Sequence, residues 1–241
     1  MEIKVAPSFL SADFAHIEKE AHRCEEAGAD ALHIDIMDGH FVPNLSMGPK
    51  IVAAINRSTN LFLDIHLMMY NPFDYIEKFV EAGADLITFH FEATENVEYT
   101  LEFIRKANCK AGLSINPETD VSFLFPYLDK CDLVLIMGVS PGYGGQKFKD
   151  CTLDKILQTR KECNQRHIFE GGNVEKDVGK QKKLLPFDIQ IDGGVNFEIA
   201  KKCILAGANF LVSGTYLFQK KHMSEGIKNL KNLKDFYNRG I

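Results

Sequence analysis

The sequence predicts a single-domain α/β protein, a (β/α)8 or TIM barrel in which eight parallel strands alternate with helices. The chain has 241 residues, 45% hydrophobic and 25% charged, which is ordinary globular usage and the length that this barrel needs as one domain. A repeated junction and a regular series of apolar runs indicate the order of the elements. We therefore expect residues 1–241 to form one barrel.

One helix-to-strand junction occurs three times along the chain. Residues 26–30 and 81–85 both read Glu-Ala-Gly-Ala-Asp, and residues 205–209 read Leu-Ala-Gly-Ala-Asn. Each segment precedes an apolar run, and its glycine suits the left-handed conformation that often ends a helix. Repetition of one αβ junction predicts stacked βα units and hence a parallel sheet.

Eight short apolar runs mark the predicted strands, and amphipathic stretches separate most of them. The runs cover residues 3–7, 31–36, 61–67, 85–90, 110–115, 132–138, 187–192 and 209–213. An open, doubly wound sheet would show the same alternation. Because the first turn has no Gly-x-Gly-x-x-Gly fingerprint, which would indicate a dinucleotide site, the closed barrel is favoured.

Helix starts are expected at Asn71, which precedes a proline, and at Asp120 and Asn196. Asn and Asp side chains accept hydrogen bonds from the first turn of a helix, and proline fits its first position. Residues 164–186 break the alternation, because they combine glycines and lysines without periodicity. We predict that they form an exposed insertion before the seventh strand, with an irregular loop as its simplest form.

Charge and cysteine usage restrict the partners and the compartment. The formal net charge is −5, with acidic and basic residues interspersed, so nucleic acid and anionic membranes are not expected partners. The six cysteines form no Cys-x-x-Cys pair, and the start of the chain has no signal-peptide pattern, which favours a cytoplasmic location with reduced thiols. We expect a small-molecule ligand and assembly into a homo-oligomer.

Polar side chains gather at the ends of three predicted strands. Side chains alternate along a strand, so His33 and Asp35 share one face of the second strand, and His66 lies on the matching face of the third. Asp192 ends the seventh strand. All strands of a parallel barrel deliver their carboxyl ends to one rim, where active sites of this fold lie.

These four residues are candidate metal ligands. Any one of them alone could be a hydrogen-bonded core residue, but four such groups at strand ends are hard to assign to packing, since unpaired buried carboxylates are strongly disfavoured. Two imidazoles and two carboxylates suit one divalent cation per subunit, namely Zn²⁺, Fe²⁺, Mn²⁺ or Co²⁺. The sequence therefore predicts a metal centre of His33, Asp35, His66 and Asp192.

Glycine-rich turns after the sixth, seventh and eighth strands are candidate phosphate-binding loops. Glycine lets backbone N–H groups approach an anion, and loops after the last two strands commonly hold phosphate in this fold. A glycine turn without a ligand is the simpler reading of any single loop. The candidate residues are Gly142, Tyr143, Gly144, Gly145, Gly193, Gly194, Gly214 and Thr215.

Three methionines, Met37, Met68 and Met137, also fall near the same predicted rim. Methionine commonly fills gaps in a core, so packing is the simpler interpretation. Next to a metal and an anionic intermediate, however, an apolar sulfur can exclude water without adding charge. We include these methionines among the candidate substrate contacts.

Several longer motifs are shared with a known family. They are Ala6-Pro-Ser8 with Asp13, residues 33–44 (His-Ile-Asp-Ile-Met-Asp-Gly-His-Phe-Val-Pro-Asn), residues 64–68 (Asp-Ile-His-Leu-Met), Met137 with residues 141–148 (Pro-Gly-Tyr-Gly-Gly-Gln-Lys-Phe), and residues 192–194 (Asp-Gly-Gly). With these motifs, which run through almost the whole chain, the sequence closely resembles the ribulose-phosphate 3-epimerase family. The chain departs from the family pattern at Gly138, where serine is usual, and at Ser140, where a longer polar residue is usual.

The resemblance implies a barrel enzyme that interconverts D-ribulose 5-phosphate and D-xylulose 5-phosphate through an enediolate. It implies a divalent metal on the four candidate ligands, Asp35 and Asp192 as the acid/base pair, and Ser8 and His66 as substrate contacts. A D-allulose-6-phosphate 3-epimerase is the nearest alternative. A barrel decarboxylase or aldol-type lyase is less favoured, because the Asp-x-Lys-x-x-Asp motif typical of such enzymes is missing from the third strand. A phosphate-binding protein without turnover is a third alternative.

Overall fold

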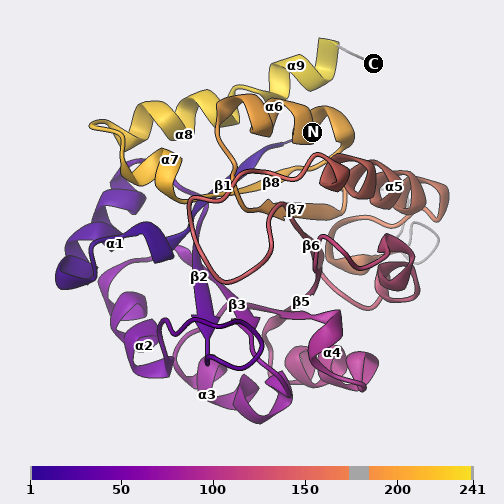
Figure 1. Ribbon diagram of the computed structural model, residues 1–241, viewed down its shortest axis with the longest axis horizontal. Coiled ribbons are helices and arrows are strands. Elements are labelled where there is room, and N and C mark those ends of the chain that lie inside the picture. Colours follow the sequence, from indigo (N-terminus) through magenta and orange to yellow (C-terminus); the bar gives the residue numbers. More distant parts are fainter. Residues whose placement is uncertain (1, 174–184, 240–241) are drawn as a thin grey trace.

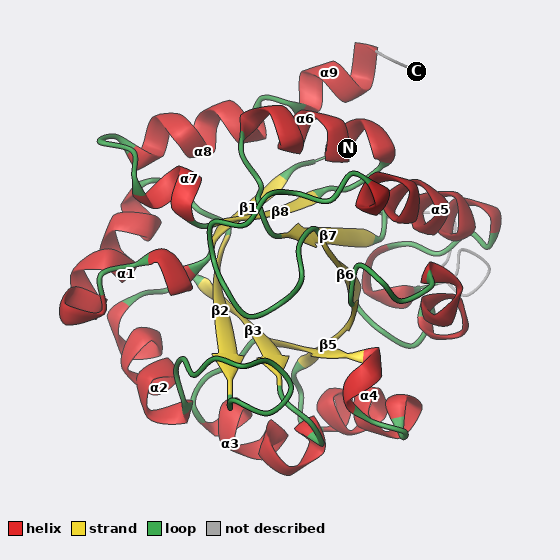
Figure 2. Ribbon diagram, viewed as in Figure 1, coloured by secondary structure: helices red, strands yellow, loops and turns green. Residues whose placement is uncertain are grey.

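The computed structural model describes residues 2–173 and 185–239, and its centre is a ring of eight parallel strands surrounded by helices (Figures 1 and 2). The strands are β1 (Lys4–Pro7), β2 (Ala31–Met37), β3 (Phe62–Met68), β4 (Leu86–His90), β5 (Lys110–Ile115), β6 (Leu133–Met137), β7 (Asp188–Asp192) and β8 (Phe210–Ser213). All eight expected strands are confirmed, each end agreeing to within one residue.

The strands follow the order β1-β8-β7-β6-β5-β4-β3-β2, and every neighbouring pair is parallel. Between β1 and β2 a single parallel bridge joins Ser8 to His33. The sheet thus closes almost completely into a barrel, as expected. Closure brings the carboxyl ends of all eight strands to one rim.

Helices form the outer layer. The α-helices are α1 (Ile17–Glu26), α2 (Pro49–Ser58), α3 (Ile76–Glu81), α4 (Val97–Lys106), α5 (Cys151–Gln165), α6 (Phe197–Ala206), α7 (Thr215–Phe218), α8 (Met223–Lys231) and α9 (Lys234–Arg239). The 3-10 helices are η1 (Phe9–Ser11), η2 (Phe14–His16), η3 (Pro72–Tyr75), η4 (Phe91–Ala93), η5 (Val121–Tyr127) and η6 (Glu170–Gly172). No helix within the described ranges has the length and apolar character needed to span a bilayer.

The expected helix starts fall where helices begin, but they differ in kind. Asn196 accepts a hydrogen bond from the backbone N–H of Ile199 and caps α6. Asp120 caps in the same way but begins the 3-10 helix η5. Asn71 precedes η3 without a side-chain cap, since its own backbone is left-handed, with φ of 49°. At Asn71 the turn uses backbone conformation in place of a capping bond.

The repeated junctions fasten the amino-terminal rim of the barrel. The last residue of each repeat, just before an even-numbered strand, accepts a hydrogen bond from a backbone N–H of the preceding strand. A fourth bond of the same kind comes from Asp132, outside the repeats. The bonds run from Val5 to Asp30, from Leu63 to Asp85, from Ala111 to Asp132 and from Ile189 to Asn209, each at 2.8 Å. One side-chain oxygen thus joins the two strands of each of these four pairs, which are β1–β2, β3–β4, β5–β6 and β7–β8.

Alternation along the strands divides the interior into two unlike regions. Side chains that face the helices form a continuous apolar layer, which includes Ile34, Ile65, Ile136 and Ile191. Side chains that face the barrel axis form a smaller apolar cluster and a set of buried polar groups. The buried polar groups on the axis are His33, Asp35, Asp64, His66, Thr88, His90, Ser114 and Gln190. The apolar layer supplies most of the hydrophobic stabilisation, because burial of apolar area is its source.

The expected insertion at residues 164–186 overlaps the end of α5 and contains η6. Phe169 forms an isolated antiparallel bridge with Pro186, so the two ends of the stretch meet. Residues 174–184, the centre of the expected insertion, lie outside the described residues.

Candidate metal centre and active site

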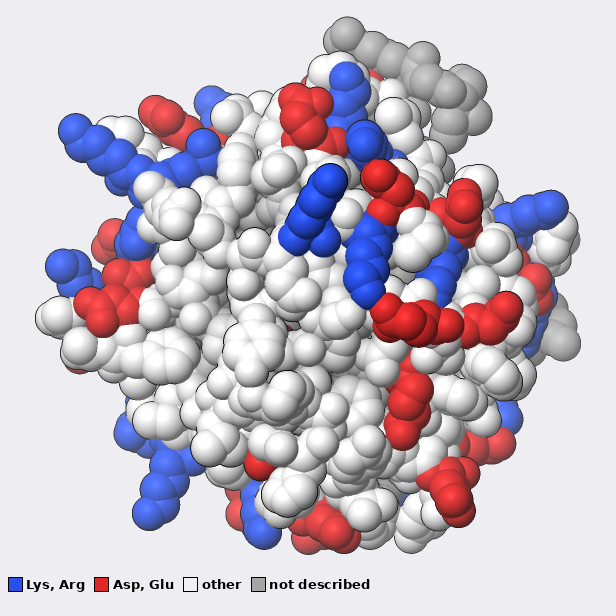
Figure 3. All heavy atoms as spheres, in the orientation of Figure 1, with Lys and Arg blue, Asp and Glu red and all other residues white. Residues whose placement is uncertain are grey.

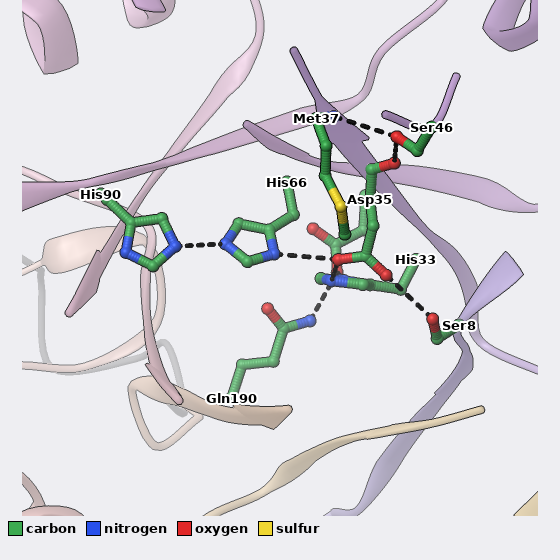
Figure 4. Close-up of polar contacts among 9 residues, drawn as sticks. Ser8, His33, Asp35, Met37, Ser46, His66, His90 and Gln190 are labelled. Atoms are coloured by element: carbon green, nitrogen blue, oxygen red, sulfur yellow. Dashed lines mark hydrogen bonds and ion pairs between the residues drawn. The ribbon is translucent and has the colours of Figure 1, made fainter. Parts of the chain in front are cut away.

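The four expected metal ligands converge at the carboxyl-terminal rim. One nitrogen or oxygen atom from each of His33, Asp35, His66 and Asp192 lies within 4.8 Å of the others. The first three residues are buried, and Asp192 is half-buried. The convergence follows from register, since β2 and β3 place Asp35 directly beside His66. Figure 4 shows how the side chains from β2 and β3 meet.

His33 is held from below by Asp64. Its Nδ1 is 2.7 Å from Asp64 Oδ2, which also accepts a hydrogen bond of 2.5 Å from Gln190 Nε2. A carboxylate only accepts, so Nδ1 donates and the Nε2 atom faces the cluster. Nε2 is buried and has no hydrogen-bond partner among the described residues. Such an orphaned atom is what a metal-ligating histidine presents.

Asp35 lies at the centre of the cluster. Its Oδ2 accepts a hydrogen bond of 2.9 Å from the Ser8 hydroxyl, and its Oδ1 is 3.1 Å from His66 Nδ1 and 3.4 Å from His33 Nε2. Ser46 fixes the end of the strand, because its hydroxyl donates to the Asp35 carbonyl at 2.6 Å. The side chain therefore has one defined position.

The pKa values of Asp35 and Asp192 are shifted in opposite directions. Burial alone raises the pKa of Asp35, but the imidazoles of His33 and His66 outweigh burial and hold that pKa well below its usual range. At Asp192, burial and then the charge of Asp35 raise the pKa above its usual range. Paired groups whose environments separate their pKa values are suited to act as acid and base.

The pKa values of His33 and His66 are also shifted in opposite directions. Burial lowers the pKa of His66 to about 4, so this imidazole is neutral near pH 7. Burial also lowers the pKa of His33, but Asp64 and Asp35 outweigh it and raise that pKa well above its usual range. A proton at His33 therefore compensates the surrounding carboxylates in the metal-free protein, and a bound cation would displace it.

The donor set fits a divalent cation. Imidazole nitrogen and carboxylate oxygen are ligands for Zn²⁺ and for the neighbouring first-row metals, and buried carboxylates need a positive partner. His33 Nε2 is buried at the cluster without a hydrogen-bond partner among the described residues. The buried His33, Asp35, His66 and Asp192 group could thus hold a metal ion.

A pocket of about 280 Å³ opens above the cluster. Two of the candidate metal ligands, Asp35 and Asp192, line it, whereas His33 and His66 are not among its lining residues. The other expected site residues that line it are Ser8, Met37, Met68, Met137, Gly142, Tyr143, Gly144, Gly145, Gly193, Gly194, Gly214 and Thr215. Gln146, which lies within the motif of residues 141–148, also lines it, as do Ser11 and Gln219, which belong to no motif in the sequence.

The described lining of the pocket contains no Lys or Arg. An anion there would be bound by backbone N–H groups and hydroxyls, for which the glycine turns are suited. Gly193 and Gly194 follow β7 with φ of 106° and 68°, conformations that other residues rarely adopt. The surface over this end of the barrel is mainly uncharged, with most Lys, Arg, Asp and Glu side chains toward the periphery (Figure 3).

The loop after β6 crosses the mouth of the barrel (Figure 1). It is joined to the loop after β2 by two hydrogen bonds: Tyr143 donates its hydroxyl to the Pro43 carbonyl at 2.5 Å, and Asn44 Nδ2 donates to the Gly142 carbonyl at 2.7 Å. The methionines lie beneath, where Met37 and Met68 pack with Val42. The pocket therefore has an apolar wall on the side of β2 and β3.

Gly138, which departs from the family pattern, occupies a crowded position after β6. A Cβ atom there would lie 2.6 Å from the Gly193 carbonyl oxygen and 2.8 Å from the Phe148 ring. The backbone N–H of Gly138 donates to the Asp192 carbonyl at 2.6 Å. The missing side chain thus lets the loops after β6 and β7 approach closely next to Asp192.

A parallel barrel with two carboxyl groups, a candidate metal centre and a glycine-lined pocket at its carboxyl-terminal rim has the features of a barrel enzyme. A model of the ribulose-phosphate 3 epimerase family matches residues 4–218. The chain belongs to the ribulose-phosphate 3-epimerase family.

Curated relatives support this assignment over the full length of the barrel. A ribulose-phosphate 3-epimerase of Chlamydia muridarum is 44% identical over 218 residues, which are 90% of this chain and 89% of the relative. A ribulose-phosphate 3-epimerase of Bacillus subtilis is 42% identical over 232 residues, with 96% and 100% covered. Among solved structures, a 3-hexulose-6-phosphate synthase aligns with a TM-score of 0.64 at 15% identity, covering 97% of this chain and 99% of that one, which shows a shared fold.

Proposed function

We propose that this chain is a metal-dependent epimerase that interconverts D-ribulose 5-phosphate and D-xylulose 5-phosphate. The observation that carries the proposal is the convergence of His33, Asp35, His66 and Asp192 below a pocket that both carboxyl groups line. The relatives named above, which are ribulose-phosphate 3-epimerases, support the substrate.

Epimerisation next to a ketone needs a base on one face of the substrate and an acid on the other. Asp35 and Asp192 come from β2 and β7, which β1 and β8 separate in the sheet. In the proposed reaction one carboxylate removes the proton from carbon 3, giving an enediolate, and the other returns a proton to the opposite face. The roles exchange when the reaction runs in reverse.

The metal would be held by His33 through Nε2, by His66 through Nδ1 and by one oxygen of each carboxylate. Bound there, a divalent cation acts as a Lewis acid that polarises the carbonyl and the neighbouring hydroxyl of the substrate. Ser8 orients Asp35 by its hydrogen bond of 2.9 Å. Met37, Met68 and Met137 line the pocket, and their apolar side chains would limit access of water to the enediolate.

The phosphate of the substrate would be bound by the turns after β6, β7 and β8. Their residues line the pocket on the side of Asp192, and the neutral lining leaves backbone N–H groups and hydroxyls as the donors. Gly214 supports this function, because a Cβ atom there would lie 2.5 Å from Ser11 Oγ and would fill the space next to the turn.

A combined metal and substrate assay tests the proposal. We expect about one divalent ion per chain by elemental analysis, and a higher kcat/KM with ribulose 5-phosphate than with allulose 6-phosphate. In deuterated water, solvent deuterium should enter the product at carbon 3. Full activity after a chelator has removed all metal would contradict the role of the metal, and turnover without deuterium exchange would contradict the two-base mechanism.

A further inference from the structure

His66 has a second partner on the side away from Asp35. Its Nε2 atom is 2.9 Å from Nε2 of His90, and the two rings are stacked at a centroid distance of 5.0 Å. Both side chains are completely buried. Figure 4 shows His90, His66 and Asp35 joined in one line of contacts, from β4 through β3 to β2.

His90 in turn faces a carboxylate. Its Nδ1 atom is 3.4 Å from Oε2 of Glu92, which lies in η4 directly after β4. The other oxygen of Glu92 accepts a hydrogen bond of 2.8 Å from the backbone N–H of Asn116 and another from the Thr119 hydroxyl. Burial alone raises the pKa of Glu92, but the neighbouring His90 imidazole and hydrogen bonds from Thr119 and Asn116 lower it to about 2. Glu92 is therefore a fixed anion.

These contacts set the direction of the hydrogen bonds. Two imidazole nitrogens at 2.9 Å need one N–H and one lone pair between them. The anion at Glu92 favours a proton on Nδ1 of His90, which leaves His90 Nε2 to accept. With a cation bound beside Asp35, His66 would then donate from Nε2 and leave the lone pair of its Nδ1 for the metal.

We propose that His90 and Glu92 are positioning residues that hold His66 in the Nε2–H tautomer, with Nδ1 aimed at the metal. The inference rests on the proposed metal site and adds two residues behind it. His33 has the corresponding support, because Asp64 accepts from its Nδ1 at 2.7 Å. Each histidine ligand is thus oriented by a carboxylate, directly for His33 and through a second imidazole for His66.

Packing around His90 fits a positioning function. The ring of Phe41 lies against His90 at a centroid distance of 4.8 Å, and His90 does not line the pocket. A tightly packed imidazole cannot turn to exchange its two nitrogens without displacing its neighbours. The orientation of His66 is therefore fixed before any metal binds.

The first test reads the tautomers directly in the wild-type protein loaded with Zn²⁺. Long-range ¹H–¹⁵N correlation spectra of ¹⁵N-histidine-labelled protein distinguish the Nε2–H from the Nδ1–H form. We expect His66 as the Nε2–H tautomer and His90 as the Nδ1–H tautomer. The reverse pair of tautomers overturns the inference, and this measurement needs no variant that has to fold.

The second test measures metal binding and its geometry. Glu92→Gln and His90→Phe should weaken the binding of Zn²⁺, measured by competition with a chromophoric chelator, by roughly 10- to 100-fold, as is common when an outer partner of a ligand is lost. The visible absorption bands of the Co²⁺-loaded protein should shift. Thr119→Val removes one donor to Glu92 and should give a smaller effect in the same direction. Glu118→Gln is the matched control, because Glu118 is exposed and pairs with Lys149.

The outcomes separate this inference from the proposed function. Wild-type protein that binds neither Zn²⁺ nor Co²⁺ contradicts the metal site itself. Wild-type protein that binds Co²⁺, combined with a Glu92→Gln variant of unchanged affinity and unchanged spectrum, overturns the positioning function alone, even if that variant melts at a lower temperature. Should His90→Phe fail to fold, Glu92→Gln and Thr119→Val decide the question.

Discussion

The two rims of the barrel use aspartate in opposite ways. At the amino-terminal rim, Asp30, Asp85 and Asp132 each accept a hydrogen bond from a backbone N–H of the preceding strand, and all three are partly or largely exposed. At the carboxyl-terminal rim, Asp35 and Asp192 lie close together beside two imidazoles in a largely buried cluster. Aspartate satisfied by backbone donors stabilises the fold, whereas aspartate crowded with like charge is available for chemistry.

The difference predicts that the rims respond separately to mutation. A change at the amino-terminal rim should lower the free energy of unfolding and leave turnover unchanged. Replacement of Asp192 at the carboxyl-terminal rim should lower turnover and leave the free energy of unfolding unchanged or higher, because its carboxyl group is buried near like charge.

The largest effect is expected for Asp35→Asn and Asp192→Asn. Each substitution removes one member of the proposed acid/base pair, and we expect kcat to fall by about 10³-fold or more. The melting temperature of metal-free Asp192→Asn should equal or exceed that of the wild type, since a carboxyl group near like charge is lost. Steady-state kinetics, metal analysis and thermal unfolding measure these effects. An unchanged kcat in either variant would reject its assignment.

Gly138→Ala is expected to affect both properties. The new Cβ would lie 2.6 Å from the Gly193 carbonyl oxygen, so the loop that carries Gly193 must move. We expect a loss of about 1–3 kcal/mol in the free energy of unfolding, as for other overpacked sites, and a several-fold rise in KM. Gly144→Ala is the control, because a Cβ at Gly144 meets no atom within 4 Å. Equal effects of the two substitutions in urea unfolding would contradict the crowding at Gly138.

Asp85→Ala should affect stability alone. It leaves the backbone N–H of Leu63, a fully buried residue, without its acceptor, which corresponds to about 1–2 kcal/mol. Asp85→Asn keeps an acceptor, as Asn209 does at the fourth junction, and should lose less. Urea unfolding measures the loss of stability, and steady-state kinetics measures whether kcat is unchanged. A large loss of kcat in folded Asp85→Ala would contradict the prediction that the two rims respond separately to mutation.

Tyr143→Phe should give the smallest effect. It removes the hydrogen bond from the half-exposed Tyr143 to the Pro43 carbonyl, which joins two loops over the pocket. We expect a change of about 0.5 kcal/mol or less in stability and a two- to threefold rise in KM, in line with the modest net value of a solvent-exposed hydrogen bond. A rise in KM above tenfold would show that the loop contact controls substrate binding more strongly than this bond allows.

The fold could be predicted from the sequence because two local signals agree. The repeated junctions place Gly28, Gly83 and Gly207 at helix ends, and all three have positive φ. Apolar runs then give the strands to within one residue. The junction at Asp132 has no such signal, since its segment lacks the Gly-Ala pair and its bond from Ala111 depends on the pairing of β5 with β6.

The convergence of the candidate metal ligands could also be predicted, because parity along parallel strands determines which side chains share a face. The partners behind them could not. Asp64 lies on the same face as His66, but its hydrogen bond to His33 follows from the register of β2 and β3. His90 ends β4, and Glu92 follows that strand in η4. Neither residue belongs to a sequence motif. Their function depends on distances across β3 and β4 that spacing alone does not give.

The division of side chains by parity has a further consequence for evolution. On β3, Ile65 packs in the outer apolar layer, while its neighbour His66 faces the axis. Substitutions among aliphatic residues at Ile65 would be selected for their packing against the helices. Substitutions at His66 would be selected for their effect on the reaction. A new activity can therefore arise in this scaffold by altering every other residue of a few strands, while the intervening residues preserve the barrel.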